Sequence, residues 1–146
     1  MEHIRTEIDI AASPAAVWHV LTDFPAYPAW NPFVRSIRGS QAPGSPLHVT
    51  VQPEGGKPMS FKPRLLIFEP GKELRWKGRL LAPGIFDGEH YFALSEPSPG
   101  TVHFVHGEVF RGLLVPLVFR GAMRAGTERG FAAMNRALQA RAEAQA

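Results

Sequence analysis

Cysteine is absent from this chain of 146 residues. The protein therefore has no disulfide bond, no thiolate nucleophile and no cysteine-ligated zinc. Long apolar runs are absent too: the longest, residues 113–119, is interrupted by Pro116 and is far shorter than the roughly 20 residues of a membrane-spanning helix. Residues 1–5 are not followed by the apolar run of a secretory signal, so we expect a cytoplasmic protein without a membrane span.

The chain also lacks a strong excess of one charge and the common catalytic motifs. The net charge is +3, and Lys and Arg are spread along the chain rather than clustered, so we expect no nucleic-acid partner. The sequence has no His-Glu-x-x-His, phosphate-binding Gly-rich loop, dinucleotide fingerprint or Ser–His–Asp motif. His103 and His106 are three apart on an expected strand and should face opposite ways. We predict neither a metal nor a cofactor.

The composition is that of an ordinary globular protein. Hydrophobic residues make up 45% of the chain and charged residues 20%, which is unlike a disordered segment. No repeat, low-complexity tract or linker divides the sequence. We therefore predict one domain over residues 1–146, and its oligomeric state stays open.

The first third of the chain predicts a strand followed by two short helices. In residues 3–10, isoleucines alternate with charged residues, which is typical of a strand with one buried face. Ser13 suits a helix N-cap and Pro14 the first turn, so a short helix is predicted to end near Asp23. A single helical turn is predicted at residues 26–29, where prolines exclude anything longer.

Turns rich in Pro and Gly separate the following segments, which predicts consecutive antiparallel strands. We place them at residues 33–39, 46–53, 59–69, 72–82, 86–96 and 101–110. The fourth of these has the clearest alternation, with an apolar inner face and a basic outer face. The inner face carries Leu74, Trp76, Gly78 and Leu80, and the outer face carries Arg75, Lys77 and Arg79.

Residues 113–144 are rich in good helix formers and predict one long helix, with Pro116 in its first turn. Its apolar stripe comprises Leu117, Met123, Thr127, Phe131, Met134 and Leu138. Gly121, Gly126 and Gly130 each weaken a helix by about 1 kcal/mol relative to alanine. Close packing, or space for a ligand, would explain these glycines.

Short motifs follow one another in a recognisable order along the chain. They are IDIAASPAAVW (8–18), DFPAYPAWNPF (23–33), LRWKG (74–78), FDGEHYF (86–92), GT (100–101) and HGEVFRGLL (106–114). In this order they resemble the START-like, or SRPBCC, superfamily, which includes birch-pollen-allergen relatives and the polyketide cyclase/dehydrase and lipid-transport group. The resemblance covers essentially the whole chain.

The resemblance implies an α+β helix-grip fold. A curved antiparallel sheet of about seven strands would wrap around the C-terminal helix, with two short helices after the first strand and a hydrophobic cavity between sheet and helix. Periodicity shows only apolar faces, and these can also meet in a solid core. The residues predicted to bind a ligand in the cavity are Trp30, Asn31, Val49, Val51, Phe61, Leu65, Trp76, Gly78, Leu80, His90, Phe92, Phe104, His106, Glu108, Phe131 and Met134.

Three polar residues share the apolar parity of their strands: His90, His106 and Glu108. A histidine beside a carboxylate can act as a general base, so these are the candidate catalytic residues. The alternatives are a structural His–Glu hydrogen bond, or a shift of parity that turns the side chains to water. Asn31 can hydrogen-bond a ligand or form a turn before Pro32.

Three functions follow from these observations. The first is binding of a small hydrophobic molecule, such as a lipid or polyketide-like compound, as a carrier or sensor. The second is a cyclase or dehydratase reaction by the His–Glu pair. The third is an interaction module that uses the basic face of Arg75, Lys77 and Arg79. Arg111 and Arg120, near the start of the long helix, can attract an anionic head group or remain solvated.

Overall fold

The structure is a computed structural model that describes residues 1–80 and 82–145, apart from the side chain of Leu80. The elements follow the predicted order of strand, short helices, further strands and long helix. They are β1 (Glu2–Ile10), α1 (Pro14–Thr22), the 3-10 helix η1 (Phe24–Ala26), α2 (Tyr27–Trp30), β2 (Val34–Gly39), β3 (Leu47–Val51), β4 (Met59–Phe61), β5 (Arg64–Glu69), β6 (Glu73–Leu80), β7 (Phe86–Ser98), β8 (Thr101–Arg111), α3 (Val115–Val118) and α4 (Gly121–Ala144).

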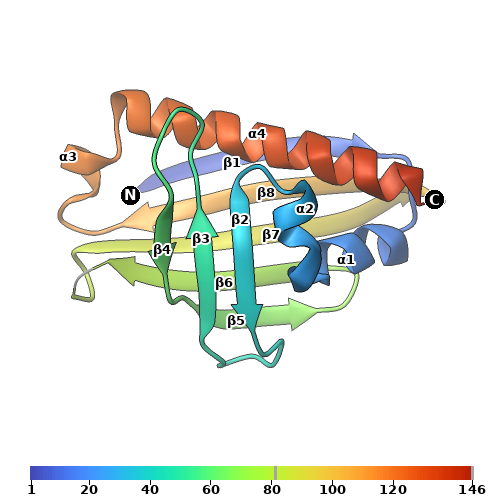
Figure 1. Cartoon of the computed structure of the whole chain (residues 1–146), viewed down its shortest axis with the longest axis horizontal. Coiled ribbons are helices and arrows are strands. Elements are labelled where there is room, and N and C mark those ends of the chain that lie inside the picture. The colour runs from blue at the N-terminus through green and yellow to red at the C-terminus, as the bar shows by residue number, and fades with distance from the viewer. Residues whose placement is uncertain (81, 146) are drawn as a thin grey trace.

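The strands form two antiparallel sheets, and the α+β class is confirmed. A large sheet has the order β1-β8-β7-β6-β5, and a small sheet has the order β2-β3-β4. In Figure 1 the strands of the small sheet run across those of the large one, and α4 lies along β1 and β8. The large sheet, the small sheet and α4 thus enclose the interior, as the helix-grip resemblance implied.

The two sheets are joined at one corner. The backbone N–H of Leu47, at the start of β3, donates to the carbonyl oxygen of Pro63 (2.8 Å). Two further backbone bonds link Gly44 and Ser45 to Leu65, at 2.8 and 2.9 Å. Away from this corner β4 and β6 are not hydrogen-bonded neighbours, because β4 belongs to the small sheet and β6 to the large one.

The prediction of one strand over residues 59–69 is wrong. The structure has two strands there, β4 and β5, separated by Lys62 and Pro63. A proline has no N–H to donate to a β-ladder, so Pro63 ends the pairing with β3 and lets β5 join the other sheet. The chain therefore has eight described strands instead of about seven.

The predicted helix over residues 113–144 is also interrupted. A single turn, α3, is followed by Phe119 and Arg120 in non-helical conformations, and α4 begins at Gly121 with a φ of 55°. A positive φ costs glycine little, which explains the residue at this position. The interruption turns Phe119 inward, where its ring stacks on Phe110 with centroids 4.0 Å apart.

The other two glycines of α4 allow close packing. A methyl group at Gly130 would lie 2.5 Å from Cδ1 of Phe33, and one at Gly126 would lie 2.9 Å from the carbonyl oxygen of Glu54. The N–H of Glu54 donates to the carbonyl oxygen of Gly126 at 3.2 Å. These glycines therefore hold the β2 and β3–β4 segments against the helix.

Much of the interior is a solid core. Trp76, Phe92, Phe104, Phe131 and Met134 are all fully buried and belong to one continuous hydrophobic cluster. Within residues 1–80 and 82–145, no helix combines the length and apolarity needed to cross a bilayer.

Candidate functional site

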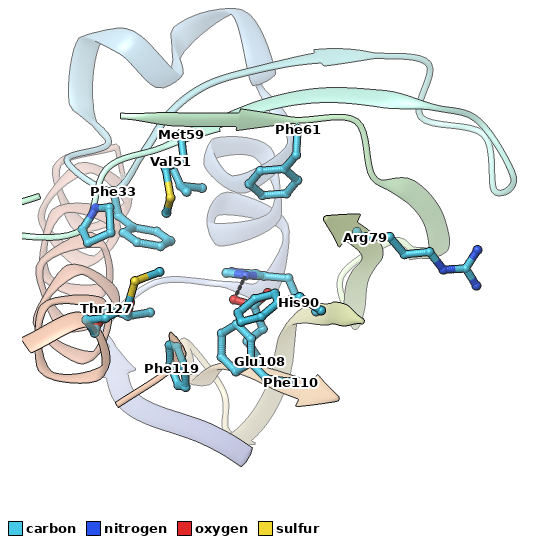
Figure 2. A pocket seen from close by; sticks show the side chains of 15 residues that line it. Phe33, Val51, Met59, Phe61, Arg79, His90, Glu108, Phe110, Phe119 and Thr127 are labelled. Carbon is cyan, nitrogen blue, oxygen red and sulfur yellow. Dashed lines mark hydrogen bonds and ion pairs between the residues drawn. The ribbon is translucent and has the colours of Figure 1, made fainter. Parts of the chain in front are cut away.

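An apolar pocket lies between the two sheets, at the end of the molecule where α4 begins. Its walls come from the ends of β3, β4, β6, β7 and β8 and from the first turns of α4 (Figure 2). The lining residues are Phe33, Val51, Pro53, Met59, Phe61, Gly78, Arg79, Phe86, Gly88, His90, Glu108, Phe110, Phe119, Met123 and Thr127. Nearly the whole wall is apolar, with His90 and Glu108 as a polar spot on one side.

The cavity volume is about 90 Å³. Sites that enclose a drug-sized ligand measure roughly 300–1,000 Å³, so this pocket admits a single ring or the end of a chain in the conformation described. A larger guest requires the walls to move apart.

Five of the predicted ligand-binding residues lie in the pocket wall: Val51, Phe61, Gly78, His90 and Glu108. Gly78 leaves room for Phe61, since a methyl group there would sit 3.2 Å from its ring. Gly78 on β6, His90 on β7 and Glu108 on β8 reach the wall because each faces the inner side of the large sheet. The sequence predicted a cavity between the sheet and the C-terminal helix, whereas this pocket lies between the two sheets, with only the first turns of α4 in its wall.

The structure places most of the other predicted residues in the solid core, away from the pocket wall. There the apolar faces of sheet and helix meet directly, and the side chains fill the space that the cavity prediction had left open. These residues are Val49, Leu65, Trp76, Phe92, Phe104, His106, Phe131 and Met134, all buried. Leu80 was also predicted to bind a ligand, and its side chain lies outside the described residues.

Trp30 and Asn31 lie away from the pocket wall as well. The Oδ1 atom of Asn31 accepts from the backbone N–H groups of Phe33 and Val34, both at 2.9 Å. Asn31 thus forms the turn that leads into β2. Trp30 packs edge-on against Tyr27, with centroids 5.2 Å apart.

A chain of hydrogen bonds starts at the pocket and runs into the core. Glu108 Oε1 lies 3.1 Å from His90 Nδ1, and His90 Nε2 lies 2.7 Å from His106 Nε2. The β7–β8 register pairs His90 with Glu108 directly. Aromatic rings hold both imidazoles: Trp76 stacks on His90 at 5.0 Å, and Phe131 stacks on His106 at 4.0 Å.

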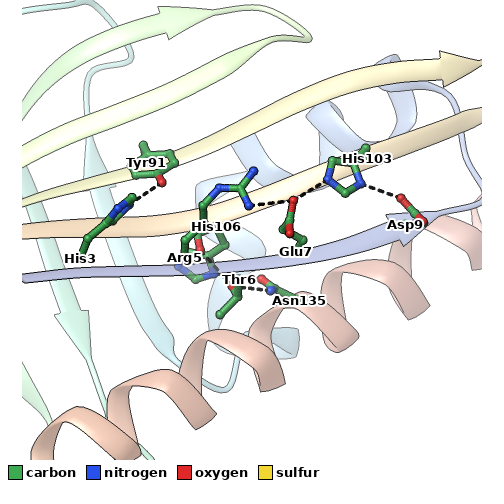
Figure 3. Close-up of polar contacts among 9 residues, drawn as sticks. All are labelled: His3, Arg5, Thr6, Glu7, Asp9, Tyr91, His103, His106 and Asn135. Carbon is green, nitrogen blue, oxygen red and sulfur yellow. Dashed lines mark hydrogen bonds and ion pairs between the residues drawn. The ribbon is translucent and has the colours of Figure 1, made fainter.

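The chain continues through Asn135 on α4 to Thr6 on β1 (Figure 3). His106 Nδ1 lies 2.9 Å from Asn135 Oδ1, and Asn135 Nδ2 donates to Thr6 Oγ1 at 2.8 Å. The Thr6 hydroxyl donates its own hydrogen to the carbonyl oxygen of His106 at 2.9 Å. Its oxygen can therefore only accept from Asn135, which fixes the orientation of the amide.

Burial lowers the pKa of His106 well below the usual 6.5, and the neighbouring His90 lowers it further. Hydrogen bonds to Asn135 and to the backbone of Phe131 act in the opposite direction and do not overcome burial. His106 is therefore neutral at physiological pH, with one ring hydrogen.

The hydrogen positions along the chain follow from these partners. Because Asn135 Oδ1 accepts, His106 carries its hydrogen on Nδ1, and its Nε2 must accept from His90 Nε2–H. One proton then lies between His90 Nδ1 and Glu108 Oε1, on either atom. The pocket therefore has, on an apolar wall, a carboxyl group that is hydrogen-bonded to an imidazole held in place by its other partners.

Sequence reasoning missed Thr6 and Asn135 as members of this chain. Asn135 follows Met134 and precedes Leu138 on the buried side of α4. A polar residue at that spacing signals a buried hydrogen-bond partner. Thr6 gave no comparable signal, since threonine is common in strands.

The outer face of the large sheet carries mixed charge, unlike the basic face that the sequence predicted. Arg75 bonds to Glu73 at 2.7 Å and to Glu89 at 2.6 Å. Glu73 lies on β6 itself, and β7 places Glu89 beside Arg75, a neighbour that the alternation within β6 does not reveal. This neutralisation removes the main argument for an interaction module at Arg75, Lys77 and Arg79.

His103 and His106 face opposite sides of β8, as their parity predicted. His103 lies on the outside, 2.7 Å from Asp9 Oδ1 and 2.9 Å from Glu7 Oε1 (Figure 3). Arg111 and Arg120 are both exposed. Among the described residues, no three His, Asp or Glu side chains are arranged to hold a metal ion.

Comparison with known proteins gives a family and a fold. A family model described as polyketide cyclase / dehydrase and lipid transport matches residues 1–143. The Zhui aromatase/cyclase of Streptomyces sp. R1128 is 19% identical, with a TM-score of 0.79 over 99% of this chain and 94% of that one. A START superfamily protein of Mycobacterium smegmatis is 18% identical, with a TM-score of 0.75 over 99% of both chains. No curated protein sequence matches the chain.

Proposed function

Because this chain belongs to the polyketide cyclase/dehydrase and lipid transport family, we propose that it binds a small hydrophobic molecule in the pocket between its two sheets. The observation that carries the proposal is a nearly wholly apolar wall broken at one point by Glu108 and His90. Small-molecule sites have this composition, because apolar contact supplies affinity and a few polar groups set the orientation. The protein then acts as a carrier or sensor for its guest.

Filling the pocket tests this proposal. Val51 lies in the wall and is 7% exposed, so Val51→Phe would place a ring in the cavity of about 90 Å³. We expect at least a roughly tenfold loss of affinity for 4-propylphenol, measured by NMR titration, because the ring and the probe compete for one space. Adding a ring costs stability too, by about 1–3 kcal/mol.

The matched control is Leu66→Phe, which adds a ring at an exposed position of β5. It should bind the probe as the wild type does. Equal affinity in Val51→Phe and wild type would place any binding site elsewhere. Native mass spectrometry of freshly purified protein provides an independent check, since a resident guest would appear as added mass.

A second candidate function is proton transfer to or from the bound molecule, as in a cyclase or dehydratase. The contact between Glu108 and His90 favours it, since a general base needs a carboxylate or imidazole within reach of the substrate. The bond to His106 holds the His90 ring in place and fixes which of its nitrogens meets Glu108.

Gly88→Ala separates this second function from binding. A methyl group at Gly88 would overlap Glu108 Oε2, so the carboxyl group must leave its place beside His90. We expect the rate of deuterium exchange into benzoylacetone, a probe that enolises, to fall by at least about tenfold, since general-base catalysis contributes roughly 10²–10⁴. NMR in D₂O measures the rate.

Gly56→Ala is the control, because a methyl group there meets only ordinary contacts, 3.4 Å from the carbonyl oxygen of Pro53. Its exchange rate should equal that of the wild type. If the wild type exchanges the probe no faster than buffer, the acid–base proposal fails while the binding proposal stands.

A further inference from the structure

The second carboxyl oxygen of Glu108 faces the pocket without a donor. Oε1 is occupied by His90, at 3.1 Å. Oε2 lies over the Cα atom of Gly88, another wall residue, and within the described part of the chain no side-chain or backbone donor is hydrogen-bonded to it. Gly88 makes this position available, because any side chain would displace the oxygen.

The chain of hydrogen bonds determines whether Oε2 donates or accepts a hydrogen bond. In one arrangement Glu108 is protonated on Oε1 and donates to His90 Nδ1, so Oε2 is a carbonyl oxygen. In the other, His90 holds the proton and Glu108 is a carboxylate. A proton on Oε2 is excluded, because Oε1 and the Nδ1 lone pair would then face each other as two acceptors. Oε2 is an acceptor in both arrangements.

The rest of the wall offers an anion no compensation. Arg79 is the cationic residue of the wall, and its guanidinium points away from the cavity into solvent (Figure 2). Its side chain is 52% exposed, and its Nε atom lies 4.0 Å from Asp87 Oδ1. A carboxylate guest would therefore place its charge against an acceptor in an apolar pocket, which is unfavourable.

We propose, on the basis of the ligand-binding function above, that the pocket selects molecules whose buried polar end is a neutral hydroxyl donor, such as a phenol, an enol or an alcohol. The hydroxyl donates to Glu108 Oε2, and the apolar body lies against Phe33, Phe61 and Phe110. Free fatty acids and other carboxylates are excluded as guests with that end inward.

Three probes of nearly the same shape test the inference at pH 7 by NMR titration. 4-Propylphenol has a hydroxyl donor, 4-propylanisole lacks it, and 4-propylbenzoate is an anion. We expect the phenol to bind about five- to tenfold more tightly than the anisole, the range that one net hydrogen bond supplies. The benzoate should bind most weakly.

Two substitutions at Glu108 assign the preference to Oε2. In Glu108→Gln, the amide N–H can donate to His90 Nδ1 and the amide oxygen takes the place of Oε2, so the preference for the phenol should remain. In Glu108→Met, a side chain of similar length has no acceptor, and the ratio of phenol to anisole affinity should fall to about one.

The outcomes are distinguishable. Binding of none of the three probes would overturn the proposed function itself. Binding of all three with equal affinity would leave that function standing and overturn the selection of hydroxyl donors. Tighter binding of the benzoate, or an unchanged preference in Glu108→Met, would also overturn it.

Discussion

Phe131→Ala is expected to lower the free energy of unfolding by about 3–5 kcal/mol, the usual cost of truncating a buried aromatic side chain. Phe131 is fully buried on α4, and its ring stacks on His106 and meets Phe33 edge-on at 5.1 Å. Its removal leaves a cavity where sheet, helix and hydrogen-bond chain come together. Denaturant unfolding measures the loss.

Leu117→Ala is the matched control for this measurement. Leu117 belongs to the apolar stripe predicted from the sequence, yet on α3 it is 64% exposed. Its truncation should change the free energy of unfolding by no more than about 0.5 kcal/mol. A loss below about 1 kcal/mol in Phe131→Ala would mean that the contact of α4 with the sheet is much looser than described.

The pH dependence of stability should carry the signature of His106. Its pKa in the folded protein lies well below 6.5, and in the unfolded chain it returns to about 6.5. Below pH 6.5 the unfolded chain binds a proton that the folded protein does not, so stability is fully present above pH 6.5 and falls on acidification. The slope approaches about 1.4 kcal/mol per pH unit wherever the unfolded chain holds this one proton and the folded protein does not.

Denaturant unfolding of wild type and His106→Gln across pH 5–8 isolates this contribution. The difference between the two proteins should shrink as the pH falls from 6.5 to 5, with a slope that approaches about 1.4 kcal/mol per pH unit, because glutamine does not titrate. Parallel curves for the two proteins would show that His106 is not held neutral.

His103 provides a control of opposite sign. Hydrogen bonds to Asp9 and Glu7 raise its pKa above 6.5. Its contribution is present below pH 6.5 and is lost as the pH rises through the folded-state pKa. The wild type should therefore lose some stability as the pH rises, and His103→Gln should not show this loss. The effect should be small because the ring is 35% exposed.

Local patterns predicted most of the elements. Ser13 caps α1 with its side chain accepting from the N–H of Ala16, as its position before Pro14 predicted. The alternation in β6 correctly placed Leu74 and Trp76 inside and Arg75 outside. Such features depend on neighbours within a few residues, and the sequence contains those neighbours directly.

The extent and place of the pocket depend on contacts between distant segments. Phe92 and His90 have the same parity on β7, yet only His90 reaches the pocket, because Phe92 is fully buried and packs against Trp76 and Phe104 in the core. Phe119 joins the wall because the helix breaks before Gly121, and the periodicity of the helix gave no sign of the break. The sequence therefore predicted an apolar interior but not which part of it stays open.

The two sheets share no ladder of paired strands. Three backbone bonds join residues 44–47 to residues 63–65 at one corner, and on the opposite side the N–H of Glu54 donates to the carbonyl oxygen of Gly126. On that side Phe33 also packs against Gly130 and Phe131, and Arg129 forms an exposed ion pair with Glu54. A guest larger than the cavity of about 90 Å³ would therefore disrupt these contacts rather than a ladder between strands.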